Sequence, residues 1–254
     1  TTSFHLSSVY KLDVFVYLLT ALMVFIILKN KGFVFAVPLI CIVAILIHPS
    51  YAVFCFSPVF TALTMRSFRD EPEHAKRNIF VLALTLIIVA TVTAYILFVA
   101  NNNLKYDLDT YLHIMEDRGN NSTAIKSFLK LVYFYDTKVH MDYCNSMIAP
   151  FLRVISVAYF LFVTSPVWLI YAYIYKKIID GQKTVLSKLA VFGCMLSVFV
   201  TLILYINETD LGRWNQTMLF NCILSLTFAC ITTKPENAWY KNINIKAFIF
   251  YAFI

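Results

Sequence analysis

Long apolar runs, separated by polar connections, dominate this sequence and limit what it can fold into. Apolar residues make up 60% of the 254 residues, and charged residues make up only 14%. Soluble domains average about 25% charged residues. A soluble globule cannot bury this much apolar surface, so part of the solvent must be lipid. We therefore predict an all-α fold, a polytopic transmembrane helical bundle that forms one domain over residues 1–254.

The apolar runs predict seven membrane spans and a possible eighth, because each is close to the length that crosses the hydrocarbon core. The third predicted span is short and contains Pro58, so we expect it to be tilted, broken or re-entrant. Pro38, Pro58 and Pro166 also predict kinks. The first run is read as a span rather than a removable signal peptide, and the last run, after Lys246, is too short to cross as a helix. The predicted spans are 12–28, 33–48, 51–65, 79–99, 150–175, 189–206 and 215–233, with a stub from about 243.

The distribution of Lys and Arg predicts the orientation of these spans. The connections on one side hold 13 basic and five acidic residues, and the other side holds eight basic and nine acidic residues. Cytoplasmic loops carry the excess of Lys and Arg. The side with 13 basic residues is therefore predicted to be cytoplasmic, and the N-terminus is predicted to be outside. This places His48-Pro49-Ser50, the loop 100–149 and the stretch 207–214 on the outside.

The loop 100–149 is long for a connection without structure of its own, which is typical of a functional or internally folded loop. After Ser122, a plausible N-cap, apolar residues recur at helical spacing. This pattern predicts a short amphipathic helix that lies on the outer membrane surface or packs on the spans. The recurring residues are Ile125, Phe128, Leu129 and Val132.

Several function classes are disfavoured. The cytoplasmic loops carry no phosphate-binding glycine motif, and the basic residues lie between apolar runs, which favours lipid headgroups over nucleic acid. Five of the six cysteines lie in apolar runs, so neither a zinc site nor a disulfide framework is predicted. Asp, Glu, Lys and Arg are confined to the ends of the predicted spans, which argues against an ion-coupled transporter. Asp107 and Asp109 with His113 match no specific metal motif, so we predict neither a metal nor a cofactor.

Ionisable side chains gather on the predicted outside and supply the candidate site. A histidine and a carboxylate together can act as general acid and base. Arg153 and Arg213 can bind a phosphate, because a guanidinium offers two parallel donors. Arg213 has a second interpretation, a structural ion pair with Asp210 or Glu208. Trp214 is either an interfacial anchor or a platform for a sugar ring.

Short outward motifs give the chain a family resemblance. They are DLDTY at 107–111, with Asp107, Asp109 and Tyr111, IHPSY at 47–51, and DLGRW at 210–214. With the many spans and the long outside loop, they resemble bacterial inner-membrane proteins of surface-polysaccharide assembly, the O-antigen and exopolysaccharide polymerases.

The resemblance implies a metal-independent glycosyltransferase. It would transfer a glycan from a polyprenyl-pyrophosphate-linked donor at the outer face of the inner membrane. Arg213 and Arg153 would hold the pyrophosphate, and Asp210, Glu208 or His48 would deprotonate the acceptor hydroxyl. The alternative is a non-enzymatic membrane protein, such as a sensor, an immunity protein or an assembly subunit, and a channel or transporter is less favoured. Partner membrane proteins or a second copy of the chain remain open.

Cysteine labelling tests the predicted orientation. We expect S50C, the native Cys144 and D210C to react with a membrane-impermeant thiol reagent in intact cells, because all three lie on the predicted outside. K183C, on the predicted cytoplasmic side, is the control and should react only after permeabilisation. Reaction of the first three only from the cytoplasmic face would overturn the orientation.

Overall fold

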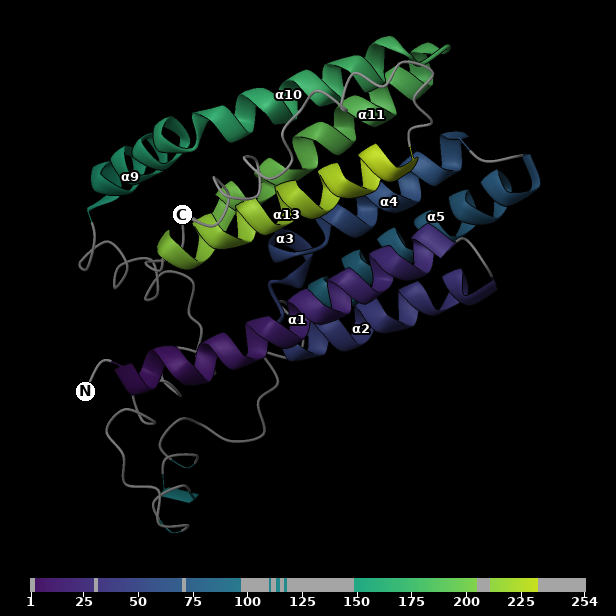
Figure 1. Ribbon diagram of the computed structural model, residues 1–254. Helices are drawn as coiled ribbons and strands as arrows, with labels where there is room; N and C mark the ends of the chain where they lie inside the picture. Colours follow the sequence, from purple (N-terminus) through teal and green to yellow (C-terminus); the bar gives the residue numbers. More distant parts are fainter. Residues whose placement is uncertain are drawn as a thin grey trace.

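The chain folds as a set of packed helices in the computed structural model (Figure 1). The structure describes residues 3–29, 32–69, 72–96, 110, 113–114, 117, 149–204 and 211–232, with side chains of the first helix from Asp13 onward. Every element of the described part is helical, which confirms the all-α prediction. The elements are α1 (Ser3–Lys29), η1 (Gly32–Ala36), α2 (Val37–Ile47), α3 (Tyr51–Phe54), α4 (Ser57–Arg69), α5 (Pro72–Tyr95), α9 (Pro150–Val163), α10 (Ser165–Asp180), α11 (Val185–Ser197), η3 (Val198–Ile203) and α13 (Leu211–Thr232).

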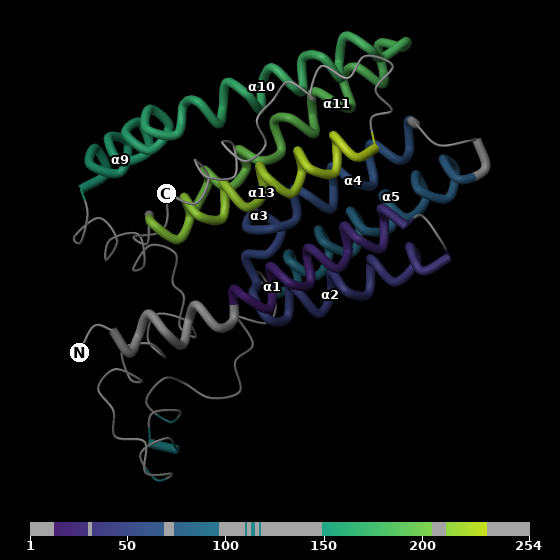
Figure 2. Tube along the Cα trace, in the orientation of Figure 1, coloured from purple at the N-terminus to yellow at the C-terminus, as the bar shows by residue number. Residues whose placement is uncertain are grey.

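The long helices run in alternating directions between two ends of the bundle (Figures 1 and 2). At one end, the Arg66 guanidinium of α4 donates to the Leu28 carbonyl of α1 at 2.6 Å and lies 6.0 Å from the Phe228 ring of α13. At the other end, the Ser57 and Ser197 hydroxyls join the start of α4 to the end of α11 at 2.9 Å. Helices α1, α4 and α13 therefore run parallel to one another, and α11 runs against them.

The prolines begin helices rather than bend them from within. Pro38, Pro58 and Pro166 each lie at the second residue of a helix, in α2, α4 and α10. Proline is tolerated there because the first helical N–H groups have no acceptor inside the helix. The predicted third span is broken, since α3 ends at Phe54 and α4 starts at Ser57. The pair α9 and α10 is bent by 68° across Thr164, just before Pro166.

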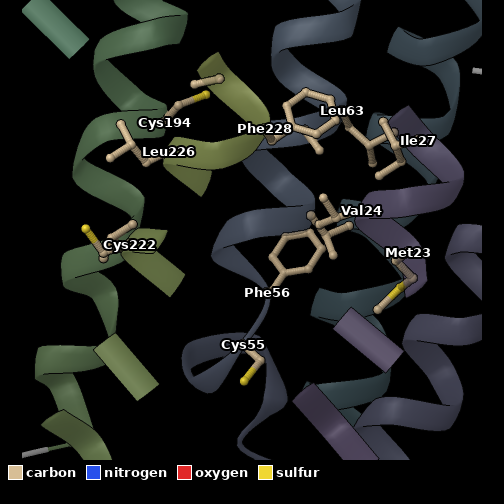
Figure 3. Packing of buried hydrophobic residues seen from close by; sticks show 14 of the residues in the cluster. Met23, Val24, Ile27, Cys55, Phe56, Leu63, Cys194, Cys222, Leu226 and Phe228 are labelled. Carbon is tan, nitrogen blue, oxygen red and sulfur yellow. The ribbon is translucent and has the colours of Figure 1, made fainter. Parts of the chain in front are cut away.

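The core lies between α1, α4 and α13, where Val24, Ile27, Phe56, Leu63 and Phe228 are buried together (Figure 3). The outer faces of the bundle are also apolar. On α2, three residues at helical spacing are exposed, namely Leu39, Val43 and Leu46. Apolar side chains on both the inner and outer faces fit a bundle surrounded by lipid.

The number of spans differs from the prediction. Among the described residues, only His74–Tyr95 and Val185–Ile203 are long and apolar enough to cross a membrane, or three stretches if Pro150–Asp180 is one bent span. The predicted span 33–48 is a 3₁₀ turn followed by an 11-residue helix. The span 215–233 has length but carries polar Asn215, Gln216 and Asn221. Two or three apolar helices are compatible with a membrane protein, but they do not make a bundle of seven or eight spans.

Two predicted features fall outside the described residues. They are the amphipathic helix after Ser122 and the stub from about residue 243. Most of the long loop 100–149, which includes Asp107, Asp109 and Tyr111, also lies outside them.

A matched pair of leucines tests which faces are packed. Leu63 is fully buried, whereas Leu39 is 64% exposed. We expect L63A to lower the free energy of unfolding by about 2–5 kcal/mol, because the substitution leaves a cavity and removes the packing contacts of the leucine. L39A should change it by less than about 0.5 kcal/mol, because most of the Leu39 side chain faces the surrounding solvent or lipid. Thermal unfolding in one detergent measures both, and equal losses would contradict the assigned core.

Candidate functional site

Three ionisable side chains meet inside the bundle, at the end where α1 and α13 begin. Asp13 comes from α1, His48 from the turn after α2, and Arg213 from the first turn of α13. Arg213 Nε donates to Asp13 Oδ2 at 2.5 Å, and Arg213 Nη2 donates to Asp13 Oδ1 at 2.5 Å. Arg213 Nη2 also lies 2.8 Å from His48 Nε2. We call Asp13, His48 and Arg213 the charged centre.

The backbone explains why these three side chains converge. His48 ends α2 in an extended conformation (φ −141°, ψ 101°), which turns the chain toward α3. Arg213 and Thr217 are one helical turn apart, and the Thr217 hydroxyl donates to the Arg213 carbonyl at 2.9 Å. The Thr217 hydroxyl also lies 2.7 Å from the Tyr17 hydroxyl, and Tyr17 is one turn after Asp13. Helices α1 and α13 are therefore joined by two successive polar contacts.

Aromatic rings enclose the charged centre. The Phe54 ring stacks on the His48 ring, with centroids 5.0 Å apart and planes at 7°. The Arg213 guanidinium carbon lies 5.5 Å from the Phe54 centroid and 4.8 Å from the Trp214 centroid. A guanidinium over an aromatic face gains cation–π energy, and more so where water is excluded.

The ion pair between Asp13 and Arg213 is buried. The Asp13 side chain is 2% exposed and the Arg213 side chain is 11% exposed. Desolvation of both charges is costly, and attraction at this separation offsets the cost only when the hydrogen bonds are well aligned. The two-point contact of a guanidinium with a carboxylate supplies that alignment.

His48 is a neutral imidazole in this setting. It lies in the turn between α2 and α3, outside both helices, where burial first and then the positive charge of Arg213 lower its pKa to about 4. Since Arg213 can only donate, His48 Nε2 must accept, and the ring proton is on Nδ1. Within the described part of the chain, Nδ1 has no side-chain acceptor.

Trp214, the predicted interfacial anchor or sugar platform, has a buried side chain. It is 2% exposed and packs edge-on against Phe54, with centroids 5.3 Å apart. The Trp214 ring points into the bundle at the start of α13 and presents no open face to a sugar in this structure. Its position at the membrane interface stays a prediction. The Trp214 Nε1–H, like His48 Nδ1–H, has no side-chain acceptor among the described residues.

The structure brings together some of the predicted site residues. His48, Arg213 and Trp214 meet as described, although they are far apart in the sequence. Arg153 lies buried near the start of α9, a helix that also packs on α13. The predicted residues Glu208, Asp210, Asp107, Asp109 and Tyr111 lie outside the described part of the chain.

Asp13 is the residue that sequence reasoning missed. The prediction began the first span at residue 12 and so treated Asp13 as a terminal charge, but α1 starts at Ser3 and places Asp13 inside the helix. The proposed structural partners of Arg213 were Asp210 or Glu208, whereas the described ion pair is with Asp13. The signal was present in the sequence, since LDVF puts one acid directly among apolar residues.

Comparison of this chain with protein-family models, curated protein sequences and solved structures finds no match. The resemblance to surface-polysaccharide polymerases therefore stays a prediction.

The protonation of His48 gives a test of the charged centre. We expect ¹⁵N NMR of histidine-labelled protein to show a neutral, Nδ1-protonated His48 at pH 5.5, because its pKa is about 4 rather than the usual 6.5. R213A should raise this pKa, since it removes a neighbouring cation, and D13N should lower it, since it removes a neighbouring anion. Unfolding would raise the pKa in both variants, so opposite shifts identify the intact centre. A wild-type His48 that becomes charged near pH 6.5 would contradict the described burial.

Proposed function

We propose that this chain is a multi-pass bacterial inner-membrane protein that acts in surface glycan assembly. In this proposal the charged centre binds the pyrophosphate of a polyprenyl-linked glycan and supports glycosyl transfer at the outer face of the membrane. The observation that carries the proposal is the convergence of Asp13, His48 and Arg213 at one end of the bundle, inside an aromatic shell. Ionisable residues inside membrane proteins mark functional sites by default, because their burial is costly.

The chemistry of the centre suits an oxyanion. Arg213 presents a guanidinium, which matches a phosphate with two parallel donors. The Nδ1–H of His48 and the Nε1–H of Trp214 are two further donors, and neither has a side-chain acceptor in the described residues. A phosphate oxygen satisfies such donors, and the exposed apolar faces of the bundle suit the polyprenyl tail.

The Asp13 carboxylate competes with a bound pyrophosphate for the Arg213 guanidinium. The carboxylate accepts from both Arg213 Nε and Arg213 Nη2. A pyrophosphate carries more negative charge than one carboxylate and therefore competes for the guanidinium. When Arg213 turns to the pyrophosphate, it releases the lone pair of His48 Nε2.

In the proposed reaction, His48 takes the proton and Arg213 holds the leaving group. The acceptor hydroxyl oxygen attacks the anomeric carbon, and the bond from that carbon to the pyrophosphate oxygen breaks. The hydroxyl proton passes to His48 Nε2, and polyprenyl pyrophosphate leaves with its charge held by Arg213. A neutral imidazole is the form that can accept this proton.

A second candidate function has its own observation. The two-point contact between Asp13 and Arg213 joins positions 200 residues apart and is almost fully buried. Such a contact also serves as a structural clasp between α1 and α13 in a non-enzymatic membrane protein. The two candidates require different experiments to separate them.

Substitution of Arg213 tests the enzymatic proposal. We expect R213A and R213K each to shorten the surface polysaccharide in the native host, because an ammonium does not reproduce the two-point contact. K188A, which removes an exposed cation at the opposite end of the bundle, is the control and should leave glycan length unchanged. Unchanged length of the surface polysaccharide in both Arg213 variants, at normal protein levels, would contradict the enzymatic proposal.

An exchange of charges separates catalysis from the clasp. D13R alone and R213D alone should each destabilise the protein by about 3–5 kcal/mol, because each leaves buried charge unpaired. The double variant D13R/R213D should recover part of this stability. If it also restores glycan length, the pair is a clasp; if stability returns without glycan, Arg213 acts on the substrate at its own position.

A further inference from the structure

Asn221, two turns after Arg213 on α13, supplies a hydrogen bond that the backbone lacks. Its Nδ2 donates to the Phe54 carbonyl at 2.7 Å and to the Thr201 hydroxyl at 3.4 Å. In a continuous helix the Phe54 carbonyl would accept from the N–H of residue 58. That residue is Pro58, which has no N–H, so the break after α3 leaves this carbonyl without its backbone donor.

The other end of the Asn221 amide has a different environment. Asn221 and Ser225 are both fully buried, and within the described chain neither Asn221 Oδ1 nor Ser225 Oγ has a hydrogen-bond partner. A buried polar atom left unpaired costs about 1–3 kcal/mol. The amide cannot simply be reversed, because Oδ1 would then face the Phe54 carbonyl, and two acceptors repel each other.

The helical spacing of Asn221 and Ser225 allows one molecule to bridge their side chains. Residues four apart lie on the same helix face, with Cβ atoms about 5–6 Å apart. A water molecule that makes two hydrogen bonds of about 2.8 Å each spans that gap. Buried waters in proteins occupy sites where polar groups otherwise lack partners.

We infer that Asn221 and Ser225 hold a structural water, and that through Asn221 this water fixes Phe54 and positions the His48 ring. The path is continuous. The water donates to Asn221 Oδ1, the amide Nδ2 donates to the Phe54 carbonyl, and the Phe54 ring stacks on His48 at 5.0 Å. Asn221 and Ser225 are thus positioning residues, since neither contacts the charged centre directly.

Both sides of the inference are measurable in the full-length protein in lipid vesicles. Water-edited solid-state NMR detects transfer of magnetisation from water to nearby side chains. We expect the fully buried Asn221 side chain to receive this transfer, and S225A to reduce it several-fold. S225A should also shift the His48 ring ¹⁵N resonances. S225A is chosen because it removes only one oxygen atom and is the change least able to prevent folding.

S67A is the matched control, because the buried Ser67 hydroxyl donates to the Leu63 carbonyl of its own helix at 2.8 Å. It should leave the Asn221 transfer and the His48 resonances unchanged. Absence of transfer to Asn221 in the wild type, or an unshifted His48 in S225A, would overturn the inference. These readouts do not involve glycan, so failure here is distinct from failure of the proposed function.

Discussion

The buried ion pair between Asp13 and Arg213 is the interaction on which this arrangement depends. It joins α1 to α13, the first and last described helices, through two hydrogen bonds of 2.5 Å. Neither charge is stable alone in a medium of low dielectric constant, since loss of one partner leaves the other desolvated and unpaired. The pair therefore fixes the axial register of α1 against α13. The hydrogen bond between Tyr17 and Thr217, one turn further along both helices, holds the same register.

The break between α3 and α4 is the second requirement, and it follows from one residue. Pro58 removes the donor for the Phe54 carbonyl, so α3 stops at Phe54 and α4 starts at Ser57, and α3 stays a single turn after His48. That turn places the His48 and Phe54 rings beside Arg213 rather than on the outside of a straight helix. Asn221 and Thr201 then supply the donors that the broken helix lacks, to the carbonyls of Phe54 and Val53. A break in a helix inside a packed bundle is tolerated where other protein groups satisfy the freed backbone groups.

Sequence patterns predicted the local features better than the relations between distant residues. Composition predicted the helical class, and Pro58 predicted the interrupted third segment. The sequence also singled out His48, Arg213 and Trp214, but not that they meet. Their convergence depends on contacts across as many as 165 residues between His48 and Arg213, and apolar periodicity carries no information about such contacts. Asp13 was assigned to the end of a predicted span, because the apolar run starts at residue 12. Helix α1 begins earlier, at Ser3, and so contains Asp13.

The existing contacts of Arg213 limit which ligands the charged centre could bind in the proposed function. Arg213 already has a carboxylate partner, a neutral imidazole and two aromatic faces, so a weakly charged ligand gains little by replacing Asp13. In the proposed function, a ligand with two adjacent phosphates would offset the loss of the ion pair through its greater negative charge beside Arg213. Specificity would then arise from competition, since an anion would enter only if it bound Arg213 better than the Asp13 carboxylate does. The released Asp13 carboxylate would be left desolvated, so exchange also favours ligands that bring a hydroxyl or another donor to it. A sugar pyrophosphate carries both kinds of group, which is why the geometry of this centre and the proposed glycan chemistry are consistent with each other.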